Sequence, residues 1–167
     1  MTIIETTPTL VRPPWAQYAF EHIGIHEIAG PKDNPWIVDA LTLAGLPGEH
    51  DERPWCGACA CKCMIKTGHG YPKGPAAARN WFGYGVRLCK PILGCIGVFK
   101  RPPNPKHAHV AFYESTILDA EDYPSAYAML GGNEDNSLKI KPYAAWRLRG
   151  FFWPPDYPLP EGAELYV

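Results

Sequence analysis

The segment ERPWCGACACKCMIKTGHG contains four of the six cysteines of this chain, and they lie within a stretch of eight residues. They are Cys56, Cys59, Cys61 and Cys63. Four thiolates can bind zinc, pairs of thiols can form disulfides, and a single thiolate can attack a substrate while its neighbours pack in a core. These alternatives place different demands on the secondary structure that carries the cysteines.

The cysteine segment is predicted to be helical, because residues 55–66 contain no proline and Gly68 follows them. On a helix Cys59 and Cys63 share one face, whereas Cys61 is rotated by about 200° from Cys59. Four ligands on such a helix cannot converge on one ion, which argues against zinc. We expect Cys59, Cys61, Cys63, Cys89 and Cys95 to be small core residues.

Cys56 differs from the other cysteines because it lies at the start of the predicted helix. The unpaired N–H groups and the positive end of the helix dipole favour a thiolate there. A cysteine in this position becomes a nucleophile when a histidine from another element lies next to it. Cys56 is therefore the candidate nucleophile.

The candidate base is a histidine at the start of the predicted strand HAHVAFYES. His107 and His109 are two residues apart, so alternation along a strand does not distinguish them. His107 follows the proline-rich loop KRPPNPK, whereas His109 begins the regular HVAFY run. We expect His109 to be the base, and a polar strand end is its alternative interpretation. His22 and His26 fall on a predicted helix, and His50 and His69 in loops.

The third group of such a site orients the imidazole, and the segment MLGGNEDNSLKI offers Asn133 and Glu134 for that role. Asp135 and Asn136 follow them. Composition alone predicts a hairpin turn here, since Gly, Asn and Asp are favoured in turns. The residues themselves leave both interpretations open.

The elements that must position these groups are predicted to be helices first and an antiparallel sheet afterwards, an α+β arrangement. Apolar spacing and proline, asparagine and glycine boundaries predict helices over 15–23, 35–43 (N-cap Asn34, stop Gly45), 55–66 and part of 74–85. Strands are predicted over 95–100, 109–115, 126–130, 137–141 and 146–153. We expect a flexible arm at 1–12, a single catalytic domain at 13–155 and a C-terminal tail at 156–167.

Composition excludes several classes of protein. The 167 residues fit one domain, and 16 Lys plus Arg against 17 Asp plus Glu leave no basic surplus for nucleic acid. No signal peptide and no apolar run of about 18 residues is visible, so we expect a cytoplasmic protein without stable membrane association. In a reducing cytosol the cysteines are expected to be thiols.

Four segments in this order, WCGAC, GPAAARNWFGYG, HAHVAFY and LGGNEDNSLKI, followed by RLRGFFWP, resemble the papain-like cell-wall hydrolases of the CHAP and NlpC-type superfamily, in the subgroup of phage endolysins. The resemblance runs from about Trp15 to Trp153. It implies N-terminal helices packed on a C-terminal antiparallel sheet, with Cys56 as nucleophile and His109 as base. It also implies that Asn133 orients the histidine, with Glu134 as the alternative, because Glu134 stands where the family has Gln.

The resemblance implies a peptidoglycan hydrolase that cleaves an amide bond, as an endopeptidase or an N-acetylmuramoyl-L-alanine amidase, and its partner would be the stem peptide. We expect a monomeric phage lysin that needs no cofactor and no metal, and that reaches the wall through holin-type release or secretion. The Asp-rich loop of calcium-binding CHAP domains is not found. Trp55, Trp81 and Tyr84 are the candidates to line a substrate cleft, although packing is the competing role for each.

Three alternatives keep part of this interpretation. The protein could be a secreted antibacterial effector amidase of the same fold, which would have an immunity protein as partner. It could be a wall-binding module of the same fold that has no catalytic activity. The third alternative is a zinc-stabilised binding protein built on the cysteine segment.

Overall fold

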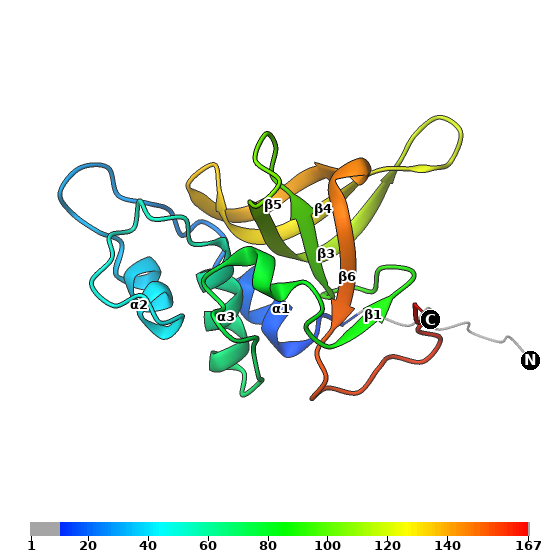
Figure 1. Cartoon of the computed structure of the whole chain (residues 1–167), viewed down its shortest axis with the longest axis horizontal. Helices are drawn as coiled ribbons and strands as arrows, with labels where there is room; N and C mark the ends of the chain where they lie inside the picture. The colour runs from blue at the N-terminus through cyan, green and yellow to red at the C-terminus, as the bar shows by residue number, and fades with distance from the viewer. Residues whose placement is uncertain (1–10, 167) are drawn as a thin grey trace, which may run out of the picture.

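The computed structural model describes residues 11–166 of the chain, which form an α+β structure (Figure 1). In this range there are three α-helices and a six-stranded sheet in which all neighbouring strands are antiparallel. The helices are α1 (Pro14–Glu21), α2 (Pro35–Leu43) and α3 (Cys56–Lys66), with short 3-10 helices η1 (Ala78–Trp81) and η2 (Ala145–Arg147). The strands are β1 (Val86–Leu88), β2 (Ile96–Lys100), β3 (Ala108–Leu118), β4 (Pro124–Glu134), β5 (Ser137–Ala144) and β6 (Leu148–Trp153). The predicted order of helices before strands is confirmed.

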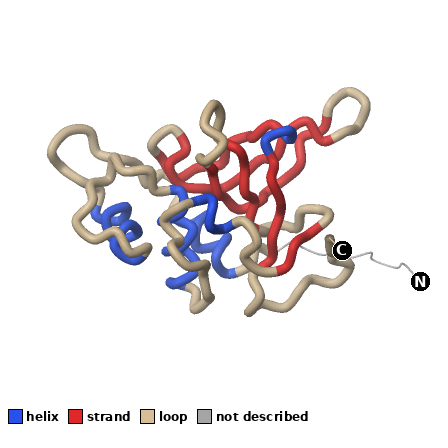
Figure 2. The backbone as a smooth tube through the Cα atoms, viewed as in Figure 1, coloured by secondary structure: helices blue, strands red, loops and turns tan. Residues whose placement is uncertain are grey.

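The sheet has the strand order β1-β6-β2-β3-β4-β5. Figure 2 shows the three α-helices grouped together on one side of the molecule and the strands on the other, with the short helix η2 lying among the strands. Helix α3 lies against α1 and α2 and also contacts β3 and β4. The helix that begins with Cys56 is therefore held between the other helices and the two longest strands.

Local sequence signals account for the helix boundaries. The side chain of Asn34 accepts a hydrogen bond of 2.9 Å from the backbone N–H of Trp36, which confirms the predicted N-cap of α2. Prolines occupy the first position of α1 and α2, where their missing N–H is not needed. Helix α1 ends at Glu21, two residues before the predicted end.

The helix predicted within residues 74–85 is reduced to the four residues of η1. Side chains take the place of helical hydrogen bonds around it, because Trp81 Nε1 donates to the Pro75 carbonyl and Asn80 Nδ2 donates to the Gly74 carbonyl, each at 2.8 Å. Strand β1, which follows directly, was not predicted. It consists of only three residues and pairs with β6, a partner far away in the sequence.

The segment LGGNEDNS divides between strand and turn. Gly131, Gly132 and Asn133 belong to β4, and the hairpin turn is made by Asp135 and Asn136 at φ 48° and 65°. Two successive residues with positive φ are typical of the type I′ turn. The turn prediction is therefore right for Asp135 and Asn136 and wrong for the two glycines.

Both ends of the described chain are tied to the sheet. Most of the predicted arm, residues 1–10, lies outside the described residues, but Arg12 forms a bidentate ion pair with Glu114 of β3, at 2.7 Å for the closest atoms. Near the C-terminus the backbone N–H of Cys89 donates to Glu164 and that of Tyr166 donates to Arg87. The segment 156–166 thus runs beside β1, and Tyr157 packs against Trp15 and Trp153.

Candidate active site

Cys56 is the first residue of α3, and the structure fixes this end of the helix from both sides. Trp55 directly before it is fully buried, and its indole N–H donates to Glu27 at 2.9 Å. Gly57 directly after it packs so closely that a Cβ there would lie 2.5 Å from the carbonyl oxygens of Pro75 and Ala76. Cys56 itself is 5% exposed. Its sulfur is therefore held at a helix N-terminus with little freedom to move.

His109 is the second residue of β3, and its side chain lies beside the Cys56 thiol, so that each group shifts the pKa of the other. The backbone N–H groups of Val110 and Gly57 also help to lower the pKa of the Cys56 thiol. The imidazole is 4% exposed. Strand β3 thus contributes an imidazole and a main-chain N–H that favour the thiolate form of Cys56, and α3 contributes a second N–H.

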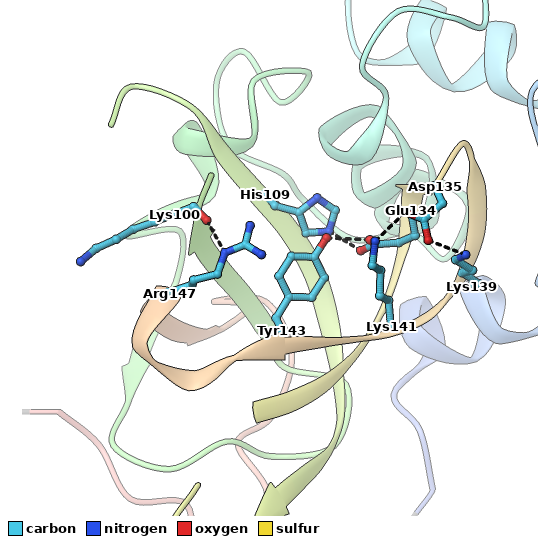
Figure 3. Close-up of polar contacts among 8 residues, drawn as sticks. All are labelled: Lys100, His109, Glu134, Asp135, Lys139, Lys141, Tyr143 and Arg147. Atoms are coloured by element: carbon cyan, nitrogen blue, oxygen red, sulfur yellow. Dashed lines mark hydrogen bonds and ion pairs between the residues drawn. The ribbon is translucent and has the colours of Figure 1, made fainter. Parts of the chain in front are cut away.

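Glu134, the last residue of β4, makes the second contact of the His109 ring (Figure 3). Its Oε1 lies 2.5 Å from Nε2 of His109, and only 1% of Glu134 is exposed. The contact is an ion pair when the imidazole is protonated. With Nε2 facing the carboxylate, Nδ1 is the ring nitrogen that remains for the thiol.

Tyr143 of β5 completes the buried arrangement around the histidine. Its hydroxyl donates to Oε2 of Glu134 at 2.6 Å, so each carboxylate oxygen has its own partner. The Tyr143 ring also stacks on the His109 ring, with centroids 4.7 Å apart and planes 9° apart. Figure 3 shows Tyr143 and Glu134 converging on the imidazole from β5 and β4. The ring of His109 is held at its edge and on its face.

The charges in this group shift two pKa values in opposite directions. Burial alone would lower the pKa of His109, but Cys56 and Glu134 outweigh it and raise the pKa to about 9. Burial alone would raise the pKa of the Cys56 thiol, but the positive charge and hydrogen bond of His109, with the Val110 and Gly57 N–H groups, lower it. The arrangement therefore favours a thiolate beside an imidazolium.

The remaining cysteines differ from Cys56. The hydrogen bond to Cys63 and burial raise the pKa of Cys59 well above its ordinary value, and burial raises those of Cys61 and Cys95 to about 12. Burial of Cys59, Cys61, Cys63 and Cys95 agrees with the predicted core role, whereas Cys89 is exposed, so the prediction is wrong for Cys89. Within residues 11–166, no three His, Cys, Asp or Glu side chains are grouped so that they could hold a metal ion.

Asn133 lies next to Glu134 but does not contact the imidazole. It is half-buried with φ 59°, and among residues 11–166 its side chain has no hydrogen bond to His109. The register between β4 and β5 shifts between Gly131 and Glu134. This irregularity breaks the alternation of side chains, and it is the carboxylate of Glu134 that meets His109. The contact is made by the alternative residue and not by the one first expected.

A pocket of about 590 Å³ opens beside Cys56. Its charged lining residues are Arg53, Arg79, Arg101 and Lys106, and exposed His107 also lines it. His107 precedes β3 and is thus not part of the buried group around His109. A smaller pocket of about 310 Å³ is lined by His109, Asn133, Glu134 and Tyr143, among others, and shares Arg101 with the first pocket.

The aromatic residues predicted to line a cleft do not line either pocket. Trp55 and Trp81 are fully buried, with their indole N–H groups bonded to Glu27 and Pro75, so the prediction is wrong for both. Tyr84 is half-buried and packs against Trp81. Large aromatic side chains stabilise a folded domain more when they are buried in its core than when they face solvent.

The basic residues at the pocket were not singled out from the sequence, because they are scattered among three segments and the overall charge is close to zero. Tyr143 was not singled out either, because it is one of several aromatic residues near or within predicted strands. No sequence signal marks it as a partner of Glu134 before the pairing of β4 with β5 is known.

Comparison of the chain with protein-family models, curated proteins and solved structures finds no match. No helix within residues 11–166 has the length and apolar character needed to cross a membrane.

Proposed function

We propose that this protein is a cysteine hydrolase that cleaves amide bonds, with Cys56 as nucleophile, His109 as general base and acid, and Glu134 as the positioning carboxylate. The observation that carries the proposal is the buried contact series from Cys56 through His109 to Glu134 and Tyr143, beside an open pocket. A nucleophile, a base and a group that orients the base are the parts that such catalysis requires.

In the first step the Cys56 thiolate attacks the carbonyl carbon of the amide, and the C–S bond forms as the carbonyl oxygen becomes an oxyanion. The backbone N–H of Cys56 has no partner within α3, because it belongs to the first turn. It is the donor available to the oxyanion, and loss of one such donor typically costs about 10²-fold or more in rate.

The tetrahedral intermediate then collapses. The C–N bond breaks, His109 gives its proton to the leaving amine, and an acyl-enzyme thioester remains. His109, now neutral, removes a proton from water, which attacks the thioester. The acid product leaves and the thiolate–imidazolium pair is restored. Glu134 keeps one ring nitrogen of His109 occupied, so that the other stays directed at the sulfur and the substrate.

Peptidoglycan is the substrate that we propose, on the strength of the sequence resemblance to papain-like CHAP and NlpC-type hydrolases. A papain-like arrangement is part of the same proposal, in which the nucleophile helix α3 packs on the strands that carry the histidine and the carboxylate. The proposal includes action on the wall after holin-type release, as a phage lysin, with the stem peptide as the partner.

The test is hydrolysis of purified peptidoglycan by the unaltered protein and by Cys56→Ala. We expect the unaltered protein to release soluble fragments whose new amino and carboxyl ends are identified by mass spectrometry, and Cys56→Ala to release none. Cys61→Ala serves as the control, because Cys61 is a buried cysteine of the same helix that lines neither pocket. Equal release by Cys56→Ala would refute the proposed nucleophile, and no release by unaltered protein would refute the substrate.

A further inference from the structure

The pocket beside Cys56 combines several cations with no carboxylate in its lining. Sixteen residues line it, and they include Arg53, Arg79, Arg101 and Lys106 but no Asp or Glu. The whole chain carries slightly more acidic than basic residues, 17 against 16. The pocket that Cys56 lines therefore carries a local excess of positive charge that the whole chain does not have.

The cations come from three separate segments around the sulfur. Arg53 lies in the loop before α3, Arg79 lies in η1, and Arg101 and Lys106 lie in the loop between β2 and β3. All four are exposed. A substrate that reaches Cys56 therefore meets positive charge on more than one side.

Within residues 11–166, three of these cations have no acidic partner. Arg53 pairs with Glu49 at 3.1 Å, but among residues 11–166 no ion pair is formed by Arg79, Arg101 or Lys106. Cations that are not neutralised by neighbouring carboxylates raise the local concentration of anionic ligands, and the walls of a pocket concentrate their field.

The loop that carries Arg101 and Lys106 is held by hydrogen bonds from its own residues and from the chain around β6. Arg147 donates to the Lys100 carbonyl at 3.0 Å, and Arg149 donates to the Pro105 carbonyl. Within the loop, the Asn104 side chain accepts from the backbone N–H of Lys106 at 2.9 Å. The two cations are therefore presented by a braced segment beside the site.

We infer that the site selects an amide substrate that carries free carboxylates close to the scissile bond, and that Arg79 and Arg101 are its specificity-determining residues. This inference rests on the proposed function. Arginine suits the task because its planar guanidinium matches a carboxylate with two parallel hydrogen bonds. Each ion pair with an exposed cation contributes little to the free energy of binding, so selectivity comes from several cations acting together.

The experiment compares soluble peptidoglycan fragments with the same fragments after their carboxylates have been converted to amides. Binding to Cys56→Ala is measured by calorimetry, and cleavage by the unaltered protein is measured as kcat and KM. We expect amidation to weaken binding by about 5- to 30-fold, which corresponds to one or two kcal/mol. The loss should appear in KM, and added salt should weaken binding of the unmodified fragments only.

Arg79→Gln/Arg101→Gln tests the assignment of the two arginines. In this variant the two kinds of fragment should bind with nearly equal affinity, because the groups that distinguish them are gone. Lys32→Gln/Lys66→Gln is the matched control: it removes the same charge from exposed positions outside the pocket, and it should discriminate as the unaltered protein does.

The outcomes separate this inference from the proposed function. Cleavage of both kinds of fragment with equal kcat/KM overturns the inference and leaves the hydrolase proposal standing. Undiminished discrimination by Arg79→Gln/Arg101→Gln overturns the role of these two arginines. Failure of the unaltered protein to bind or cleave either kind of fragment overturns the proposed peptidoglycan substrate, and this inference with it.

Discussion

At His109, burial and charge act on one imidazole in opposite directions, and charge prevails. A buried histidine ordinarily loses its proton more easily, yet the carboxylate of Glu134 and the sulfur of Cys56 raise its pKa to about 9. The same pairing lowers the pKa of Cys56. Cys56 and His109 therefore shift each other's pKa, and under the proposed mechanism these two pKa values set the pH range of activity.

We expect kcat/KM to fall on the alkaline side as pH rises through about 9, because His109 then loses the proton that it must give to the leaving amine. On the acid side activity should fall as the Cys56 thiolate is protonated, below the ordinary pKa of a cysteine. A pH–rate profile on soluble fragments measures both limbs. A fall of activity through pH 6 to 7 on the alkaline side would contradict the raised pKa of His109.

Glu134→Gln should shift the alkaline limb to lower pH and reduce kcat/KM by about 10- to 100-fold. The amide keeps the size of the side chain but removes the negative charge that helps to raise the pKa of His109. Asn133→Gly is the matched variant, since glycine adopts the φ of 59° without strain.

Asn133→Gly is expected to lose far less activity and to keep the alkaline limb near 9. The opposite result, a silent Glu134→Gln beside an impaired Asn133→Gly, would return the orienting role to the asparagine. The two variants are to be measured in the same pH–rate experiment.

At the scale of elements, the site depends on the close approach of α3 to β4. A Cβ at Gly132 would lie 2.4 Å from the ring of Trp55 and 2.6 Å from the Cβ of Cys59. Strand β4 can come this close to the helix only because it has no side chain at Gly132. Cys56 directly follows Trp55, and Glu134 lies two residues after Gly132, so the approach also sets the distance between Cys56 and the carboxylate.

Gly132→Ala should therefore lower the free energy of unfolding by about 1 to 3 kcal/mol, as overpacking of a tight contact does. Activity should fall with it, because α3 and β4 must move apart. Urea denaturation and the kinetics of fragment cleavage measure the two effects. Gly70→Ala is the control, since its nearest neighbour is the hydroxyl of Tyr84 at 3.0 Å, the end of a movable side chain. Equal stability of both variants would show that the contact is not tight.

At the scale of the whole molecule, the C-terminal segment 156–166 packs against the buried tryptophans Trp15 and Trp153. Tyr157 packs edge-on against Trp15 with ring centroids 5.0 Å apart, and its carbonyl accepts from the indole N–H of Trp153. Asp156 accepts a hydrogen bond from the backbone of Gly70 at 2.8 Å. Segment 156–166 therefore contributes to the same core as the helices and the sheet.

Removal of residues 156–167 should lower the free energy of unfolding by roughly 2 to 4 kcal/mol, because Trp15 and Trp153 lose a packed neighbour. Tyr157→Ala should reproduce much of this loss. Tyr123→Ala, at a tyrosine that is 69% exposed, should leave stability nearly unchanged. Tryptophan fluorescence during urea denaturation measures all three variants. A truncated chain as stable as the full one would show that the segment is only a tail.

Local sequence signals were sufficient wherever neighbouring residues determine the structure. Asn34 caps α2 through a bond to a residue two positions away, and Asp135 and Asn136 make their turn with their own backbone angles. The helix that begins at Cys56 and the strand that carries His109 follow in the same way from local composition. The sequence by itself thus determined the α+β order and the elements that bear the candidate nucleophile and base.

Only the tertiary structure decided which side chains meet. The register shift in β4 directs Glu134 to His109, and the pairing of β4 with β5 brings Tyr143 to Glu134. The approach of three segments assembles the cations beside Cys56, while burial places Trp55 and Trp81 in the core. These outcomes depend on contacts between residues far apart in the chain, and a shift of a single residue in a strand turns its side chains to the other face.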